Sequence, residues 1–213
     1  MGAGRVTSLA FHPNGRVLAT GSGVTSRSGT IKLWKTYDGA MIREAGQPHK
    51  DLVTGLAFNH GGDTLASSSA DKFVKTWRVS DLSLVRSFEG HTGYAQDVAW
   101  KSDGLFLASA GADKVIKVWD VEAEKQKETI SGYGKEVTAL CYLGLDDTLL
   151  SGSGDPSVKV GKTALSGVSE FVHDVAVDPA GSILVAGGED GIMRIWNAKD
   201  RKLLFTFGPP AGE

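Results

Sequence analysis

Cysteine is nearly absent from this chain, which carries a single one, Cys141, among 213 residues. One cysteine excludes an internal disulfide framework and fits a reducing cytoplasm, although a periplasmic location stays open. Cys141 falls in an apolar strand-like run, so we expect a buried and unreactive thiol. The first residues also lack the apolar segment of a secretion signal, and the sequence does not decide the compartment.

Long apolar runs and an excess of one charge are missing as well. No segment approaches the roughly 18 consecutive apolar residues that a membrane-spanning helix needs. The formal net charge is −2, which gives no electrostatic attraction to nucleic acid or to an anionic membrane surface. We therefore predict a soluble chain that binds neither nucleic acid nor membrane.

The residue patterns of common reactive sites are also absent. No two histidines have a metal-binding spacing such as His-Glu-x-x-His, and Cys141 has no partner cysteine. His12 and His60 fall in turns. His173 and Asp174 are neighbours in a strand-like run, where successive side chains point to opposite faces, so a catalytic pair is not expected there. We predict no catalytic residues, no metal and no cofactor, and hence that the chain is not an enzyme.

The chain does contain a repeat marked by tryptophan. Four of its five tryptophans end a short strand-like run, and they are Trp34, Trp77, Trp119 and Trp196. The first two steps between them are 43 and 42 residues, and a further copy, at 157–161, ends in Gly161 at 42 residues after Trp119. A period of about 40–45 residues with strand-like runs is typical of the blades of a β-propeller.

Each copy contains four strand-like segments. The first segments lie at 6–11, 53–58, 95–100, 137–142 and 172–177. A small apolar segment, the tryptophan-ended run and a fourth segment such as 84–88 complete each copy. A four-stranded antiparallel sheet cannot bury both faces alone, so stacked blades are expected. We predict an all-β propeller array in one domain, 1–213, with repeats at about 4–46, 47–89, 90–131, 132–167 and 168–207 and a tail at 208–213.

Two copies carry polar residues at one fixed spacing. A histidine is followed after 22 residues by an aspartate and after six more by the tryptophan, with a serine between, in the sets His49, Ser67, Asp71, Trp77 and His91, Ser109, Asp113, Trp119. This pattern resembles the WD40 repeat family, across essentially the whole chain. The resemblance implies a hydrogen-bonded chain of these four side chains inside each blade, because buried polar groups need partners. Aspartates recur at the same turn, at Asp155 and Asp190, which favours a structural role over acid–base catalysis.

The amino-acid sequences of two segments, 109–120 and 186–191, are similar to repeats of bacterial proteins that combine WD40 arrays with c-type cytochrome-like domains. This similarity suggests an alternative function, that of an accessory propeller of a redox or cofactor-containing enzyme. A haem attachment signature needs two cysteines, so no haem is expected on this chain itself.

The copies differ in regularity. The first lacks the histidine and has an insert at 24–28, which is a candidate contact loop. The fourth has Tyr133 in place of the histidine and Gly161 in place of the tryptophan, and it is shortened after its third strand. The fifth has Val168 and Ala186 where polar members belong. We expect blades 2 and 3 to be the most regular and blade 4 to be the least stable.

Closure of the ring is not explained by the repeats. Five blades in an open arc would expose two large apolar faces, and such faces drive association. The chain could belong to a larger ring, close as a five-bladed ring, or share a ring with another copy. We favour self-association or a larger ring; a chain made to study propeller assembly is a further alternative.

The family resemblance implies a non-catalytic scaffold for a protein or peptide partner. In such rings the partner meets the face where the loop before each first strand lies beside the turn between the second and third strands. Those positions here hold Arg5, Arg27, Lys50, Leu52, Thr92, Tyr94, Glu136, Phe171 and Glu189. Their mixture of aromatic, aliphatic and charged side chains suits a protein partner, with Tyr94 and Phe171 as anchors.

Overall fold

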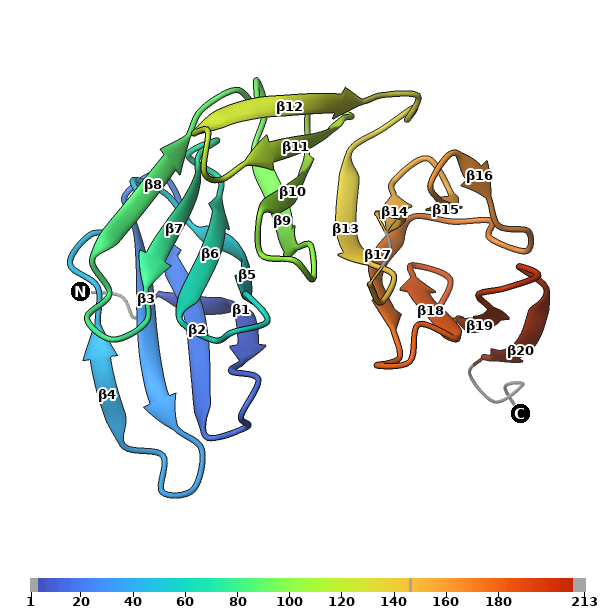
Figure 1. The fold of residues 1–213 in the computed structure, drawn as a ribbon. Helices are drawn as coiled ribbons and strands as arrows, with labels where there is room; N and C mark the ends of the chain where they lie inside the picture. Colours follow the sequence, from blue (N-terminus) through green and yellow to red (C-terminus); the bar gives the residue numbers. More distant parts are fainter. Residues whose placement is uncertain (1–3, 146, 209–213) are drawn as a thin grey trace.

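Five four-stranded antiparallel sheets make up the computed structural model, which describes residues 4–145 and 147–208. The strands of each sheet are hydrogen-bonded in chain order, and the sheets follow one another as blades along an arc (Figure 1). Within these ranges no helix is long and apolar enough to cross a membrane. The predicted all-β array of five blades is confirmed.

The blades are numbered along the chain. Blade 1 contains β1 (Arg5–Phe11), β2 (Val17–Val24), β3 (Ser28–Lys35) and β4 (Met41–Glu44). Blade 2 contains β5 (Val53–Phe58), β6 (Thr64–Ser69), β7 (Val74–Arg78) and β8 (Leu84–Phe88). Blade 3 contains β9 (Ala95–Trp100), β10 (Phe106–Gly111), β11 (Ile116–Asp120) and β12 (Lys125–Ile130). Blade 4 contains β13 (Val137–Tyr142), β14 (Leu149–Ser153), β15 (Ser157–Val160) and β16 (Thr163–Ala164). Blade 5 contains β17 (Val172–Val177), β18 (Ile183–Gly188), β19 (Met193–Asn197) and β20 (Leu203–Phe207).

The middle strands of a blade are built for close packing on both sides. In β6, Leu65 and Ala66 are fully buried, and the three serines that follow them are buried too. Along β3 buried and half-buried residues alternate, with Ile31 and Leu33 on the buried side. This period of two is that of a pleated strand. The small buried residues of the second strand allow neighbouring sheets to approach closely.

A β-bulge interrupts the register near the start of every first strand. A bulge leaves one extra residue outside the ladder. In three blades this residue is a threonine that reaches the next blade. Thr54 Oγ1 donates to the Ala95 carbonyl at 2.5 Å, Thr138 Oγ1 donates to the Val172 carbonyl at 2.7 Å, and Thr7 makes the same contact with Val53. The bulges thus join consecutive blades near the centre of the arc.

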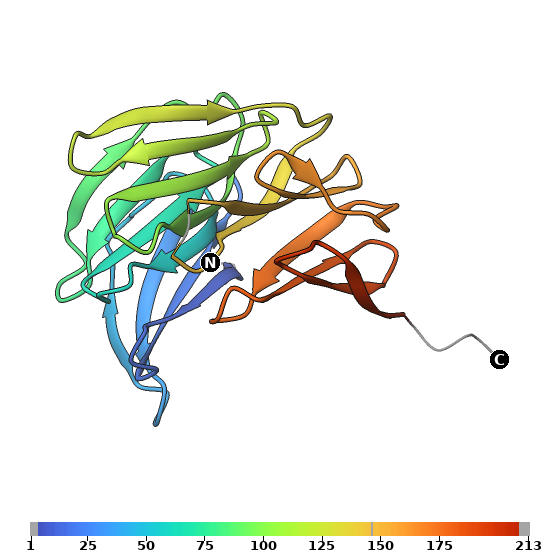
Figure 2. The same cartoon turned by 45° about the vertical axis from the view of Figure 1, so that its right-hand side comes forward.

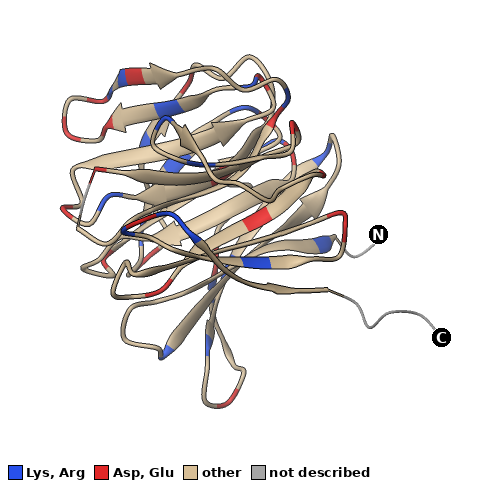
Figure 3. Cartoon of the chain, turned by 90° about the vertical axis from the view of Figure 1, so that its right-hand side faces the viewer, with Lys and Arg blue, Asp and Glu red and all other residues tan. Residues whose placement is uncertain are grey.

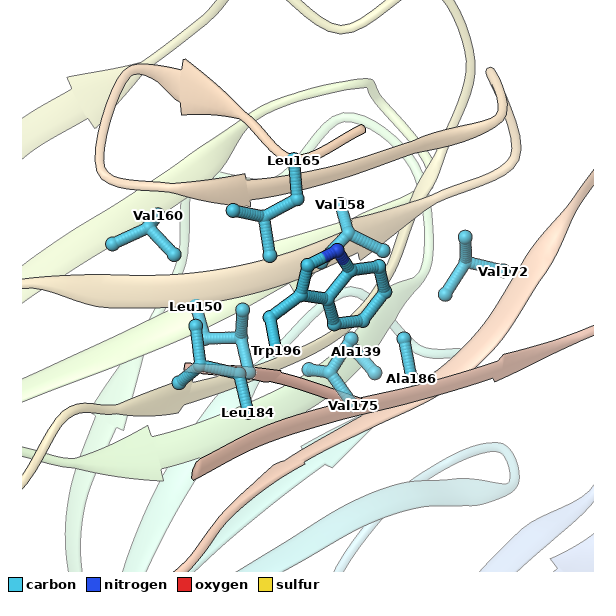
Figure 4. Close-up of a cluster of buried hydrophobic side chains, with 10 residues drawn as sticks. All are labelled: Ala139, Leu150, Val158, Val160, Leu165, Val172, Val175, Leu184, Ala186 and Trp196. Carbon is cyan, nitrogen blue, oxygen red and sulfur yellow. The ribbon is translucent and has the colours of Figure 1, made fainter. Parts of the chain in front are cut away.

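The hydrophobic core lies in the joints between blades rather than inside any one sheet. Four clusters of buried side chains occur among the described residues, and each combines residues from two consecutive blades. In the joint between blades 4 and 5, the Trp196 ring is surrounded by aliphatic side chains of both blades (Figure 4). Burial of a large apolar side chain contributes about 1.5–3 kcal/mol. Each joint is therefore a separate stabilising unit of the array.

The arc does not close on itself. Blades 1 and 5 stand at its two ends in both ribbon views (Figures 1 and 2). Val6 and Leu9 of β1 are 60% and 61% exposed, and Phe207 of β20 is 54% exposed. The two end faces thus carry the uncovered apolar side chains that the sequence predicts for an open array.

Two irregular blades depart from the common plan. In blade 4 the outer strand β16 has only two residues, which fits the predicted shortening. In blade 1 the insert at 24–28 forms the end of the β2–β3 hairpin, because Val24 pairs with Ser28. The amide of Ser26 donates to Asp51 Oδ1 at 2.8 Å, so the hairpin tip is attached to blade 2.

Candidate protein-interaction face

The four polar residues of blade 2 meet in one hydrogen-bonded chain. The Ser67 hydroxyl lies 2.7 Å from His49 Nε2 and accepts the Trp77 indole N–H at 2.8 Å, and His49 Nδ1 lies 2.9 Å from Asp71 Oδ2. An ionised carboxylate can only accept, so His49 donates from Nδ1 and its Nε2 accepts the serine hydroxyl. Blade 3 repeats this geometry within 0.1 Å for His91, Ser109, Asp113 and Trp119. Burial lowers the pKa of both histidines, because it outweighs the effect of the aspartates.

These aspartates also hold the loops that precede the first strands. Asp71 accepts the backbone N–H of Lys50 at 2.9 Å and that of Phe73 at 3.1 Å. Burial alone would raise the pKa of Asp71, but hydrogen bonds from His49 and from these amides lower it to about 2. Asp113 accepts the N–H of Thr92 in the same way, at 2.8 Å. The two networks therefore position Lys50 and Thr92 on the loop side of the blades.

The remaining blades keep parts of this network with other residues. In blade 4 the Tyr133 hydroxyl lies 2.7 Å from Ser151 Oγ, so tyrosine replaces the histidine contact. In blade 1 Trp34 donates to Thr20 Oγ1 at 2.9 Å. In blade 5 Asp190 pairs with Arg194 at 2.7 Å. The sequence signals the first two by position, whereas nothing in the spacing identifies Arg194.

Five of the predicted partner-binding residues occupy one equivalent position, directly at the start of the first strands: Arg5, Leu52, Tyr94, Glu136 and Phe171. In four blades the backbone carbonyl at this position accepts an N–H from the turn after the second strand, at 2.8–3.0 Å. The donors are Ala70, Ala112, Gly154 and Glu189. These bonds place the two kinds of loop side by side. The other four predicted residues are Arg27, Lys50, Thr92 and Glu189. We call all nine predicted residues the loop face.

The members of the loop face differ in exposure. Tyr94 is 53% exposed, and the Phe171 and Glu136 side chains are half-buried. Arg5, Arg27, Lys50, Thr92 and Glu189 are exposed. The Phe171 ring lies 5.1 Å from the His173 ring, centroid to centroid.

One member, Leu52, does not reach this surface. It is only 7% exposed, which contradicts its predicted contact with a partner. The long hairpin of blade 1 lies over it, and a Cβ added to Gly23 would come within 3.1 Å of Leu52 Cα. The insert therefore removes Leu52 from the face.

A central cavity of about 560 Å³ is lined by the first strands. Asp97, His173 and Asp174 lie on its wall. Asp97 Oδ2 accepts the Leu140 N–H of the next blade at 2.9 Å. Burial raises the pKa of Asp97 to about 7, although hydrogen bonds from Leu140 and Val98 act against it. Burial also raises the pKa of the Cys141 thiol, to about 12, and Asp97 and Asp174 add to the effect.

Neither metal-ligating residues nor charges of one sign are clustered in the described part of the chain. Across residues 4–145 and 147–208 no three histidine, cysteine or acidic side chains are grouped to hold a metal ion. Basic and acidic residues are interspersed over the ribbon rather than gathered by sign (Figure 3).

Comparison with known proteins settles the family. The model described as WD domain, G-beta repeat matches residues 2–35, 45–78, 82–120, 124–160 and 162–197. The chain belongs to the WD40 family. WD40 repeat proteins are generally non-catalytic scaffolds that mediate protein–protein interactions. All five matched segments end with the third strand of a blade, and the last three begin just before the outer strand of the preceding blade.

Curated relatives of this WD40 chain are longer proteins from eukaryotes. An uncharacterized WD repeat-containing protein of Schizosaccharomyces pombe is 26% identical over 95% of the chain and 33% of its own length. Nuclear distribution protein PAC1 of Arthroderma otae is 31% identical over 74% of the chain and 38% of its own length. The human F-box-like/WD repeat-containing protein TBL1X is 34% identical over 46% of the chain and 16% of its own length. The chain thus spans about a third of the first of these relatives, and they give no support to the expected bacterial, cytochrome-linked similarity.

Proposed function

We propose that this chain is a non-catalytic scaffold that binds a peptide or protein segment across its loop face. The observation that carries the proposal is Tyr94, a large aromatic side chain that is 53% exposed at a position where backbone hydrogen bonds hold the loop. Exposed aromatics on a fixed backbone are the usual anchors of protein interfaces. The equivalent position of blade 5 carries a second aromatic, Phe171.

The charged members of the loop face define the partner further. Arg5, Lys50 and Glu189 are exposed, and Glu136 is half-buried. Charges at the rim of an interface contribute to specificity and association rate more than to affinity. A partner segment that pairs an apolar side chain with both acidic and basic residues fits this surface best.

The test compares aromatic residues of the loop face with an exposed tyrosine at the opposite ends of the strands. Peptides selected from a phage-displayed library on the wild-type chain are measured against Tyr94→Ala/Phe171→Ala and against Tyr37→Ala. Tyr37 is 75% exposed and lies in the β3–β4 turn, at the other ends of the strands. We expect the double variant to lose at least about tenfold in affinity, as for an aromatic hot spot, and the control to keep it. Equal binding by all three proteins, or no selected peptide at all, would contradict the proposal.

We further infer that blades outside this chain complete the ring. The exposed apolar residues at the two ends of the arc support this inference, because folded proteins rarely leave such faces uncovered. The additional blades would come from a second copy or from further repeats of a longer polypeptide. Either source would leave the loop face on one side of the assembled ring.

A further inference from the structure

The first strand of blade 1 presents a face that every other blade has covered. In blades 2 to 5 the first and fourth residues of the first-strand motif are between 0% and 8% exposed; they are Val53 and Leu56, Ala95 and Val98, Val137 and Leu140, and Val172 and Val175. Val6 and Leu9 hold the same positions in blade 1 and are 60% and 61% exposed. The side chains are of the same kind, so the difference arises from the missing preceding blade.

Blade 5 presents the opposite half of such a joint. The first residue of the buried stripe on the third strand is at most 1% exposed in the four blades that have a successor: Ile31, Val74, Ile116 and Val158. Met193 holds this position in blade 5 and is 41% exposed. Phe88, at the end of the outer strand of blade 2, is 3% exposed, whereas Phe207, its equivalent in blade 5, is 54% exposed.

The internal joints show what these uncovered residues contact when a neighbour is present. The Phe88 ring lies 5.5 Å from the Trp119 ring of the next blade, centroid to centroid. Leu165, at the same position of blade 4, packs with Trp196. Trp34, the corresponding tryptophan of blade 1, is only half-buried. Phe207 and Trp34 are therefore the two unmatched members of one recurring contact.

A polar contact of the joint between blades 3 and 4 has unmatched members at the two ends as well. Asp97, the third residue of the blade 3 motif, accepts the Leu140 N–H from blade 4 at 2.9 Å. Asp174 has the same place in blade 5, and Leu9 has the place of Leu140 in blade 1. The two open ends thus match in their apolar side chains and in a hydrogen-bonding pair.

We propose that a second copy of this chain docks head to tail, with the β19–β20 face of blade 5 on the β1 face and Trp34 of the next copy. The inference rests on the proposal that further blades complete the ring, and it names their source. A second copy is the occupant favoured here, because this chain itself carries both halves of a joint that it uses four times internally. The two halves lie on different surfaces, so the contact is heterologous, and it closes a ring or extends a chain of copies.

The test uses two variants that each spoil one half of the joint. Phe207→Asp removes the blade 5 half, and Leu9→Asp removes the blade 1 half. Native mass spectrometry at low micromolar concentration should show assemblies of at least twice 22.4 kDa for the wild-type chain and monomers for each variant alone. A mixture of the two variants retains one intact pair of halves and should give a heterodimer of one copy of each. Leu145→Asp is the matched control, since Leu145 is 85% exposed in the β13–β14 turn of an inner blade, and this variant should assemble like the wild type.

The outcomes separate the alternatives. A wild-type monomer, or variants that still assemble alone, would overturn the head-to-tail joint. Circular dichroism checks that each variant is folded, and Leu9→Ser with Phe207→Ser replaces the pair if one is not. The joint variants should keep the loop-face affinity and Tyr94→Ala/Phe171→Ala should keep assembly, so either proposal can fail without the other.

Discussion

The Ser109 hydroxyl has two buried partners, and its removal should destabilise the chain more than the loss of a single hydrogen bond. Ser109 is fully buried between the His91 ring nitrogen at 2.7 Å and the Trp119 indole N–H at 2.8 Å. A buried polar group left without its partner costs about 1–3 kcal/mol. Ser109→Ala strands two such groups, so we expect a loss of roughly 3 kcal/mol in the free energy of unfolding. For a chain of this length that lowers Tm by about 6–12 °C.

A matched substitution in blade 4 makes this prediction sharper. Ser151 is also buried, but among the side chains that the structure describes its hydroxyl is hydrogen-bonded only to that of Tyr133. Ser151→Ala should therefore cost about half as much as Ser109→Ala. Urea and thermal unfolding followed by tryptophan fluorescence and circular dichroism measure both. Equal losses for the two variants would refute the argument that the serine in the complete network is shared.

Two further predictions concern the cavity wall and the blade 1 hairpin. Burial raises the pKa of Asp97 to about 7 in the folded state from an ordinary value of 3.8. Between these two values the folded chain holds a proton that the unfolded chain has lost. The contribution of this proton to the free energy of unfolding is complete below pH 3.8 and is lost as the pH rises through 7. The Tm of Asp97→Asn, relative to wild type, should therefore increase between pH 4 and pH 8, and a flat difference in a pH series of melting curves would count against it. Gly23→Ala places a Cβ 2.3 Å from the Ser28 carbonyl oxygen and should cost about 1–3 kcal/mol, whereas Gly187→Ala, with open space around the added Cβ, should not show that overpacking cost in urea unfolding.

Much of the architecture could be predicted because it depends on local and periodic features. The tryptophan period and the alternation of the strand-like runs fix the number of blades and the strands within each. The polar networks of blades 2 and 3 follow from the same spacing, since residues at repeated positions occupy repeated environments. The shortening of blade 4 could be predicted too, because the step from Gly161 to Trp196 is shorter than the steps between the earlier repeat positions.

The features that the sequence did not predict depend on side-chain contacts that the repeat spacing does not specify. Leu52 is buried by a hairpin from the preceding blade, and the length of the insert at 24–28 does not reveal which way the hairpin folds. The replacement of histidine by Tyr133 predicts the loss of the contact with the blade 4 serine. The contact is kept, because the Tyr133 hydroxyl reaches Ser151 where an imidazole nitrogen does so in blades 2 and 3. The pairing of Asp190 with Arg194 depends on a local side-chain conformation that spacing does not specify.

The offset between the sequence repeats and the blades bears on how such arrays grow. The matched segment 82–120 contains both Phe88 and Trp119, and the segment 162–197 contains both Leu165 and Trp196. Each copied stretch therefore carries the two sides of one joint, although it divides its strands between two blades. Duplicating such a stretch inserts a complete new contact between neighbours and leaves the adjacent ones intact. In this chain such a repeat therefore corresponds to a joint, and a blade forms where two successive repeats meet.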